Sequence, residues 1–467
     1  MNITFHGAAR HVTGSKHLLQ LNNGTNILMD CGMFQGMGEQ TGDMNEHFGF
    51  NPKKVDHLVL SHAHIDHCGL IPRLVAEGFK GPIYCTPATL DLAKILLLDS
   101  AKIQEQDSAY SNKHRVKKGL PPIEILYTEA DVTQAISQFK TVEYHQEFEI
   151  TPDVKLYFTD AGHVVGSAVM HLTITENGKD THITFSGDVG RYGDMILKSP
   201  QNFRQSDYIL MESTYGDSLH KDIGPIEDAL LDIIRQTCIN QKGKVIIPAF
   251  SVGRTQEILY ALNALELKGV LPDVTYFVDS PLSTKATQVL KDHPEVFNRS
   301  VNEVMKTDAD PFTFKGLHFV ESTEQSIALN TDPRACVIIS SSGMAEAGRV
   351  KHHIKNNISD SKNTILMVGY CEPNSLGGHL LNGDKQVYIF GEMYDVVANV
   401  QSIKSMSAHG DYEDLLRFLS CQDASKVKRL FLVHGEYEVQ QHFAIKLKEK
   451  GFEHVEIPFQ HQKVVLG

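Results

Sequence analysis

The residues best suited to chemistry form one short run, Ser-His-Ala-His-Ile-Asp-His, from Ser61 to His67. The run holds three histidines and an aspartate and directly follows the apolar stretch 55–60. Neutral imidazole nitrogens and a carboxylate oxygen are the ligands that zinc and similar divalent metals prefer. The alternative is a polar loop with incidental histidines. Burying so many imidazoles at a strand end without a metal, however, would leave polar atoms unpaired. The run therefore predicts a metal site.

Short strands are the elements that would position these ligands. The branched apolar residues of 55–60 predict a buried strand, so the histidines lie on the loop that follows it. The same placement recurs along the chain, where a strand-like stretch ends beside a polar residue. Ligands at separate strand ends can converge on one rim of a sheet sandwich. The later polar residues placed in this way are His163, Asp188, Glu212 and His434.

Asp30 ends a predicted hairpin made of strands at 16–21 and 26–29. An acidic residue at a strand end is often only a turn former. The functional alternative is that Asp30 supports and orients a metal-binding histidine. Further on, a long helix is predicted from Pro87 to about Gln106. The basic, proline-containing stretch 113–122 is then expected to be an exposed connection.

From about residue 226 to residue 368, predicted strands and helices alternate. This rhythm indicates a parallel sheet with helices on its faces, and ligands of such sheets bind where strands end and helices begin. Free amides, small hydroxyls and an arginine suit a phosphate there, whereas ordinary helix capping by serine is the alternative. The residues at these positions are Ser251, Arg254, Ser341, Ser342 and Gly343.

Composition narrows the class of protein. The chain has 467 residues, of which 41% are hydrophobic and 22% charged, as in a soluble globular protein of two or three domains. Seven cysteines without a C-x-x-C spacing, together with the lack of an apolar signal segment, indicate a reducing cytoplasm and no membrane partner. The formal net charge of -13 argues against a sequence-independent nucleic-acid coat but not against a nuclease with a local basic groove.

The motif His62-x-His64-x-Asp66-His67, with His163 and Asp188, resembles the metallo-β-lactamase superfamily. The stretches 212–216, 251–257, 405–411 and 432–436 resemble its β-CASP nucleases, the group of ribonuclease J and the pre-mRNA cleavage nuclease. The resemblance implies an α/β fold, a metallo-β-lactamase αββα sandwich with an inserted β-CASP cap. We expect the first lactamase segment at 1–212, the cap at 213–400 and the second lactamase segment at 401–467.

By the same resemblance, the chain is expected to be a ribonuclease that hydrolyses single-stranded RNA with two zinc ions. The first zinc would take His62, His64 and His163, and the second Asp66, His67 and His434. Asp188 would bridge the two, and Asp30 would orient ligands. Glu212 and His409 would be the acid–base pair, with His409 protonating the leaving oxygen, beside Asp66 and Asp188 as catalytic carboxylates. A histidine at position 434 is typical of RNA-acting members.

Several alternatives stay open on sequence alone. A small-molecule ester, lactone or thioester hydrolase of the same superfamily is one alternative, and a non-catalytic RNA-binding scaffold is another. Manganese suits the ligand set as zinc does, and a dimer is compatible with the sequence. Relatives carry an arginine where this chain has Gly378-His379, which removes one expected phosphate contact. The N-terminal KH-type domains of archaeal members and the C-terminal extension of ribonuclease J are not expected here.

Overall fold

The computed structural model describes residues 1–117, 119, 121–122, 124–220, 225–369, 371–403 and 407–467. Ser405 and Met406, which begin the motif at 405–411, and residues 118 and 120 of the expected basic connection lie outside the described residues. Contacts divide the chain into two compact units. The first unit comprises Met1–Leu219 together with His409–Gly467, and the second comprises His220–Ala408. The first unit is therefore built from two segments of the sequence.

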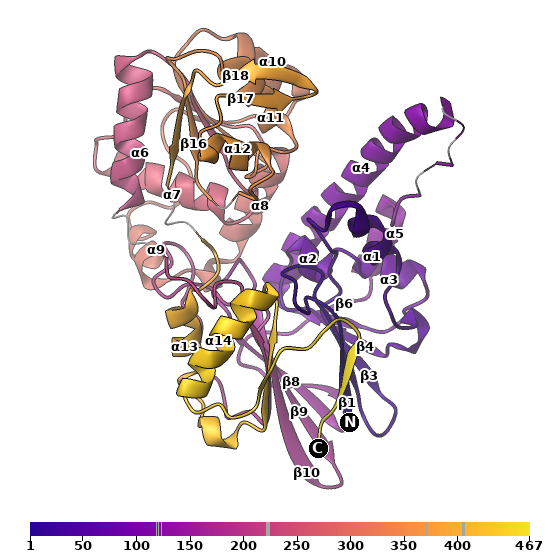
Figure 1. The fold of residues 1–467 in the computed structure, drawn as a ribbon. Coiled ribbons are helices and arrows are strands. Elements are labelled where there is room, and N and C mark those ends of the chain that lie inside the picture. The colour runs from indigo at the N-terminus through magenta and orange to yellow at the C-terminus, as the bar shows by residue number, and fades with distance from the viewer. Residues whose placement is uncertain (118, 120, 123, 221–224, 370, 404–406) are drawn as a thin grey trace. The chain divides into compact units, whose positions relative to one another are not determined.

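Two seven-stranded sheets form the first unit (Figure 1). One runs β22-β1-β2-β3-β4-β5-β6, with bounds Gln462–Val465, Asn2–Gly7, Lys16–Gln20, Asn26–Met29, His57–Val59, Ile83–Cys85 and Phe139–Thr141. The other runs β21-β20-β11-β10-β9-β8-β7, with bounds Val455–Glu456, Arg429–Val433, Tyr208–Glu212, Lys179–Phe185, Ala168–Glu176, Val154–Asp160 and Phe148–Thr151. In each sheet, strands from the C-terminal segment complete one edge: β22 in the first sheet, and β21 with the neighbouring β20 in the second.

Apolar residues from both sheets make one buried core between them. Phe5 and Leu19 come from the first sheet, and Phe158, Phe185 and Phe431 come from the second. Phe5 and Phe431 pack with their ring centroids 5.2 Å apart. The N-terminal and C-terminal segments therefore share the same core, because neither can bury its apolar face alone.

Helices cover the outer faces of this sandwich. α13 (Tyr412–Leu419) and α14 (Tyr437–Glu449) place Phe418 and Phe443 against the outer residues of β11 and β20. The remaining helices of this unit are α1 (Thr41–Glu46), α2 (Ile65–Cys68), α3 (Ile71–Ala76), α4 (Pro87–Lys117) and α5 (Glu129–Ile136), with short turns η1 (Gly38–Gln40), η2 (Pro52–Lys54) and η5 (Ala424–Lys426). The prediction that α4 ends near Gln106 was wrong. No proline or glycine interrupts 88–117, so the helix continues to Lys117.

Parallel pairing brings the important strand ends to one edge of the second sheet. β10, β11 and β20 are parallel, with Phe185 opposite Leu210 and Leu210 opposite Phe431. Their carboxyl ends therefore release Asp188, Glu212 and His434 on the same side. β3 and β4 are also parallel, so Asp30 and the run from Ser61 leave the first sheet together. Register alone thus gathers residues that are hundreds of positions apart.

The second unit contains a six-stranded, all-parallel sheet and a two-stranded hairpin. The sheet order is β14-β13-β15-β12-β16-β19, with bounds Leu317–Phe319, Thr275–Val278, Cys336–Ser340, Val245–Pro248, Thr364–Met367 and Asn399–Ser402, and the hairpin is β17 (Gln386–Ile389) with β18 (Glu392–Asp395). Its helices are α6 (Ile226–Ile234), α7 (Arg254–Leu267), α8 (Pro281–Asp292), α9 (Arg299–Val304), α10 (Thr323–Thr331), α11 (Arg349–Asn357) and α12 (Leu376–Asn382), with η3 (Arg235–Asn240) and η4 (Pro294–Val296). The alternation predicted from residue 226 onward is present.

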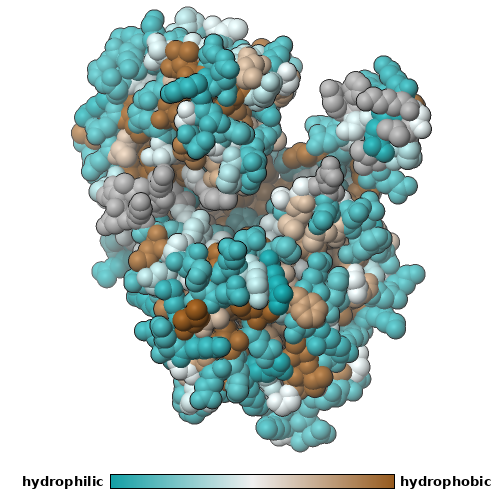
Figure 2. Space-filling model, viewed as in Figure 1, coloured by the Kyte–Doolittle hydropathy of each residue, from teal (hydrophilic) through white to brown (hydrophobic). Residues whose placement is uncertain are grey.

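The surface and the cysteines agree with the composition. Figure 2 shows a face that is mostly hydrophilic, with hydrophobic residues scattered over it. Among the residues described, no helix combines the length and the apolar content needed to cross a bilayer. All seven cysteines are free thiols, and six of them are buried.

Gly32 offers a test of how tightly the two loops at the sandwich rim are packed. A Cβ built at this position would stand 1.6 Å from the backbone oxygen of Asp66. We predict that Gly32→Ala lowers the free energy of unfolding by at least about 1–3 kcal/mol, because backbone has to move. Urea denaturation measures the effect. Gly42→Ala is the control, since its Cβ meets nothing within 4 Å. Equal stability of the two variants would contradict the prediction.

Candidate metal centre

The first group of ligand atoms comes from His62, His64, His163 and Asp188, and its atoms lie within 4.8 Å of one another. His64 Nδ1 is 3.1 Å from His62 Nε2 and 3.1 Å from His163 Nε2. Asp188 Oδ2 lies 3.5 Å from His62 Nε2 and 3.4 Å from His163 Nε2. Zinc holds such ligands tetrahedrally at about 2.0–2.1 Å, which puts neighbouring ligand atoms about 3.3–3.4 Å apart. The spacing therefore suits one small divalent ion.

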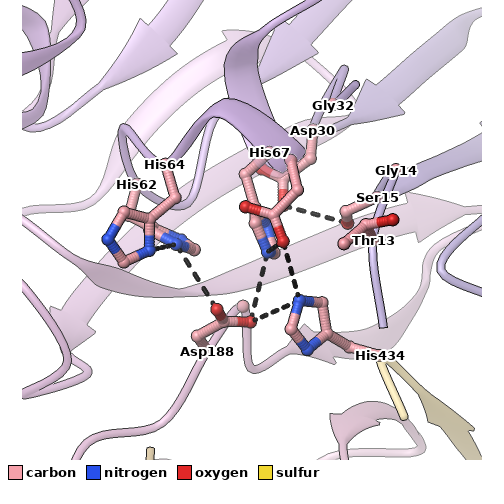
Figure 3. Close-up of polar contacts among 12 residues, drawn as sticks. Thr13, Gly14, Ser15, Asp30, Gly32, His62, His64, His67, Asp188 and His434 are labelled. Carbon is pink, nitrogen blue, oxygen red and sulfur yellow. Dashed lines mark hydrogen bonds and ion pairs between the residues drawn. The ribbon is translucent and has the colours of Figure 1, made fainter. Parts of the chain in front are cut away.

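The second group of ligand atoms comes from Asp66, His67 and His434. His434 Nε2 lies 3.3 Å from Asp66 Oδ2, and the other oxygen of Asp188, Oδ1, lies 3.2 Å from His67 Nε2 and 3.5 Å from His434 Nε2. Figure 3 shows Asp188 between the two groups, with one oxygen directed at each. A single carboxylate is thus shared by two sets of ligands.

Burial and charge prepare these side chains for a metal. Burial lowers the pKa of His62 well below its ordinary value and also lowers that of His64, so both rings are neutral near pH 7 and offer lone pairs. His67 Nε2 and Asp188 Oδ1 are buried and lie 3.2 Å apart, but neither makes a hydrogen bond of good geometry among the described residues. Buried polar atoms without partners are costly. A divalent ion would satisfy both atoms, so the donor set fits a metal.

Asp30 lies behind His67 and fixes its ring. The Nδ1 of His67 donates to Asp30 Oδ2 at 2.6 Å, which directs Nε2 toward the second ligand group. Ser61 holds the same carboxylate through its backbone N–H at 2.8 Å and its hydroxyl at 2.9 Å, and the Ser15 hydroxyl donates to it at 3.2 Å. Asp30 is fully buried. The arrangement is that of a carboxylate orienting a ligating histidine.

Local backbone geometry delivers the ligands from the loops. Asp30 and His434 both have left-handed backbones, with φ of 58° and 51°. At each residue the positive φ turns the chain away from the direction of the preceding strand, at the edge of the sheet. Asp66 and His67 fall within the short helix α2, so consecutive residues project in different directions. His62 and His64 precede that helix in the chain. One short run therefore serves two ligand groups.

Glu212 and His409 form a pair beside Asp188. His409 Nδ1 lies 3.1 Å from Glu212 Oε1 and 4.0 Å from Asp188 Oδ2. Burial alone would lower the pKa of His409, but Glu212 and then Asp188 raise it to about 9. Glu212 is held by the backbone N–H groups of Val189 and Thr214 at 2.7 and 3.1 Å. His409 also belongs to a third group of ligand atoms with Asp188 and His434. A proton-carrying imidazole thus stands at the edge of the ligand cluster.

The residues expected to contact phosphate belong to the second unit. The hydroxyls of Ser251 and Ser341 both approach Ser280, at 3.4 and 2.9 Å. Arg254 is buried and paired with Glu257. The Ser342 hydroxyl donates to the carbonyl oxygen of Ala347 at 3.3 Å, and Gly343 packs closely on Phe250. Ser251 and Ser341 therefore come together, whereas the Arg254 guanidinium is engaged by an acid.

The second unit also shows the local packing of Gly378 and His379, where relatives carry an arginine. Gly378 donates its backbone N–H to the Ser375 hydroxyl, the N-cap of α12. A Cβ at Gly378 would stand 2.2 Å from the carbonyl oxygen of Glu372. His379 pairs with Asp384 at 2.7 Å. Close packing of the helix start accounts for glycine at this position.

Sequence reasoning missed the residues that hold the ligands. Thr214 lies with Oγ1 3.0 Å from His434 Nδ1 and so fixes that ring, as Asp30 fixes His67. Ser15 and Ser61 bind Asp30, and Ser280 links Ser251 with Ser341. Each of them stands next to a strand end or a named motif. Small hydroxyl residues are so common there that no sequence signal separates them from ordinary turn and cap residues.

Three family models match successive parts of the chain. The family described as metallo-beta-lactamase superfamily domain matches residues 18–209. The Beta-Casp domain matches residues 255–380, and the Zn-dependent metallo-hydrolase RNA specificity domain matches residues 393–458. The three matches follow one another along most of the chain.

Three relatives illustrate the similarity. Ribonuclease TTHA0252 of Thermus thermophilus is 35% identical over 94% of this chain and 94% of its own length. An RNase J-like protein of Methanocaldococcus jannaschii is 31% identical over 95% of both chains. The transcription termination factor FttA of Cenarchaeum symbiosum is 30% identical over 90% of this chain but only 64% of its own length. The expected family and fold class are confirmed: the chain belongs to the β-CASP family of metallo-β-lactamase-fold hydrolases.

Proposed function

We propose that this hydrolase is a ribonuclease that cleaves phosphodiester bonds of single-stranded RNA with two zinc ions and a Glu212/His409 acid–base pair. The observation that carries the proposal is Asp188, whose two oxygens face separate ligand groups at 3.2–3.5 Å. Such a shared carboxylate suits two metals about 3.5–4 Å apart. The similarity to a ribonuclease over nearly its whole length supports RNA as the substrate.

The chemistry divides between the metals and the side chains. When bound, two divalent ions neutralise phosphate charge and activate a water molecule. His62, His64, His163 and Asp188 would hold one ion, and Asp66, His67, His434 and the same Asp188 the other. Asp30 keeps the His67 ring in place. His409, held by Glu212, would supply a proton to the leaving oxygen; in the metal-free protein its pKa is raised to about 9 by Glu212 and Asp188.

The serine cluster of the second unit supports a further part of the proposal. Ser251 and Ser341, joined through Ser280, would bind RNA phosphate with small hydroxyl groups. Ser342, Gly343 and Arg254 lie on the same loops, although Arg254 would have to leave Glu257 to reach a phosphate. Small hydroxyls and backbone amides near helix starts are suited to this role.

A cleavage assay tests the proposal directly. We expect zinc-loaded protein to cut uniformly labelled linear RNA, a chelator to stop the reaction, and His64→Ala to reduce the rate by more than about a hundredfold, because a ligand is lost. His182→Ala is the control, since His182 lies on β10 and contacts Thr173. Cleavage of a circular RNA would identify an endonuclease. Intact RNA alongside rapid hydrolysis of lactones or thioesters would contradict the proposal.

Asp30→Asn tests the support behind His67. The variant replaces a carboxylate oxygen that accepts the His67 N–H at 2.6 Å. We expect zinc affinity at one of the two sites to fall about 10–100-fold while the other site is unchanged. Competition with a chelator measures both affinities. Asp56→Asn, which alters only a bond to the backbone of Asn26, is the control. Equal affinities in the Asp30 variant and the wild type would contradict the assigned role.

Glu212→Gln tests the raised pKa of His409 in metal-free protein. Because the folded-state pKa is raised to about 9, the pair stabilises the fold fully below about pH 6.5 and loses this effect as pH rises through 9. We expect the variant to cost about 2–3 kcal/mol more at pH 6 than at pH 10. Urea midpoints with EDTA present measure the difference. Glu413→Gln is the control. Parallel curves for wild type and Glu212→Gln would exclude the pairing.

A further inference from the structure

His434 is a ligand that reaches its group from a distant part of the sequence. It belongs to the C-terminal segment, whereas Asp66 and His67, the other members of its group, belong to the N-terminal segment. Its backbone is left-handed, with φ of 51°. Left-handed geometry is unfavourable for a residue other than glycine and persists only where the surroundings impose it. Something must therefore hold the backbone of His434 in place.

The loop at 8–13, which we call the rim loop, makes those contacts. The backbone N–H of His434 donates to the carbonyl oxygen of Ala8 at 2.7 Å, and that of Gly435 donates to His11 at 3.2 Å. The rim loop is closed on itself by a bond from Ala8 N–H to the Thr13 carbonyl oxygen at 3.1 Å. Two residues of this loop, Ala8 and Arg10, are also left-handed, with φ of 47° and 62°. The rim loop is thus a strained element that fits the strained backbone of His434.

Arg10 fastens the rim loop to the segment that carries His434. Its guanidinium carbon stands 4.4 Å from the centre of the Tyr437 ring and 5.8 Å from that of Phe459. Its Nη2 donates to the carbonyl oxygen of Ile457 at 3.3 Å. All three partners lie in the C-terminal segment, and Tyr437 begins the helix α14 that follows His434. A guanidinium over an aromatic ring makes a stabilising cation–π contact.

The position of Arg10 has an energetic cost at one buried nitrogen. Its Nε is buried and has no hydrogen-bond partner in the part of the chain that the structure describes. Leaving a buried donor unpaired destabilises the fold. Despite this cost, the two ring contacts and the bond to the Ile457 carbonyl oxygen tie the rim loop to the C-terminal segment. Arg10 lies two residues from Ala8, and Tyr437 lies three residues from His434.

We propose that Arg10 is a positioning residue for His434 and acts through the rim loop on one metal site only. The inference rests on the proposed two-metal function. Removing Arg10 releases the loop, and the backbone of His434 loses the acceptors that keep it left-handed. The site made by Asp66, His67 and His434 then weakens. The other site is made by His62, His64 and His163. The rim-loop contacts of Ala8, Arg10 and His11 do not involve these three residues, so this site keeps its ion.

Zinc content and affinity of the full-length protein test this inference without any activity measurement. After loading with zinc and desalting, we expect two equivalents in the wild type and one in Arg10→Ala, with the lost site about 10–100-fold weaker in a chelator competition. Arg10→Gly separates the side chain from the backbone, because glycine accepts the left-handed geometry freely. It is expected to lose the same site as Arg10→Ala. If it kept both ions, the side-chain anchor would be excluded.

Arg429→Ala is the matched control. Arg429 also stabilises the C-terminal segment, through Glu456, the carbonyl oxygen of Val465 and the Phe431 ring. None of these partners belongs to the rim loop. We expect it to lose stability while keeping two ions. Should Arg10→Ala fail to fold, Tyr437→Leu removes the facing ring and is expected to weaken the same site to a smaller degree. Two ions with unchanged affinity in the Arg10 and Tyr437 variants would overturn the inference. Fewer than two in the wild type would instead refute the two-metal function on which it rests.

Discussion

The site depends on one carboxylate, that of Asp188. Both of its oxygens are buried and each faces a different set of imidazoles, so cations on both sides would compensate its charge. The parallel register of β10, β11 and β20 puts Asp188, Glu212 and His434 on the same edge. The run from Ser61 approaches from the other sheet. A sandwich of two sheets is what allows ligands to surround that carboxylate.

The charged and polar groups around the ligands form a second layer, in which each group contacts one histidine ring. Asp30 holds His67, Thr214 lies against His434, and Glu212 holds His409, each at about hydrogen-bond distance from the histidine Nδ1. Fixing one ring nitrogen orients the other, so each pair converts a rotatable side chain into a rigid one. Because these partners come from different strand ends, the rigidity of the site depends on the sandwich as a whole.

Much of this could be read from the sequence. The density of His62 to His67 predicted a metal site, and the change of rhythm after Glu212 predicted an inserted α/β unit; the family and fold class are confirmed. The resemblance supplied Glu212, His409 and His434. The sequence did not reveal Ser15, Ser61 or Thr214, whose roles depend on tertiary contacts rather than on local pattern. The predicted end of α4 near Gln106 was wrong because the polar C-terminal part of this helix was interpreted as an exposed connection. The left-handed loop at 8–13 has no sequence signal, since its residues are not glycine.

Because the first unit is made of two sequence segments, its site can form only after the second segment has been synthesised. Residues 1–219 contain the run from Ser61, His163 and Asp188, but His409 and His434 are made only after the entire second unit. Chains emerge from the ribosome with the N-terminal part first. A partly synthesised chain therefore carries at most one complete ligand group and lacks His409. The cluster is complete only when β20 and the residues around it have joined the sheets, so the ligand set and the folded sandwich arise together.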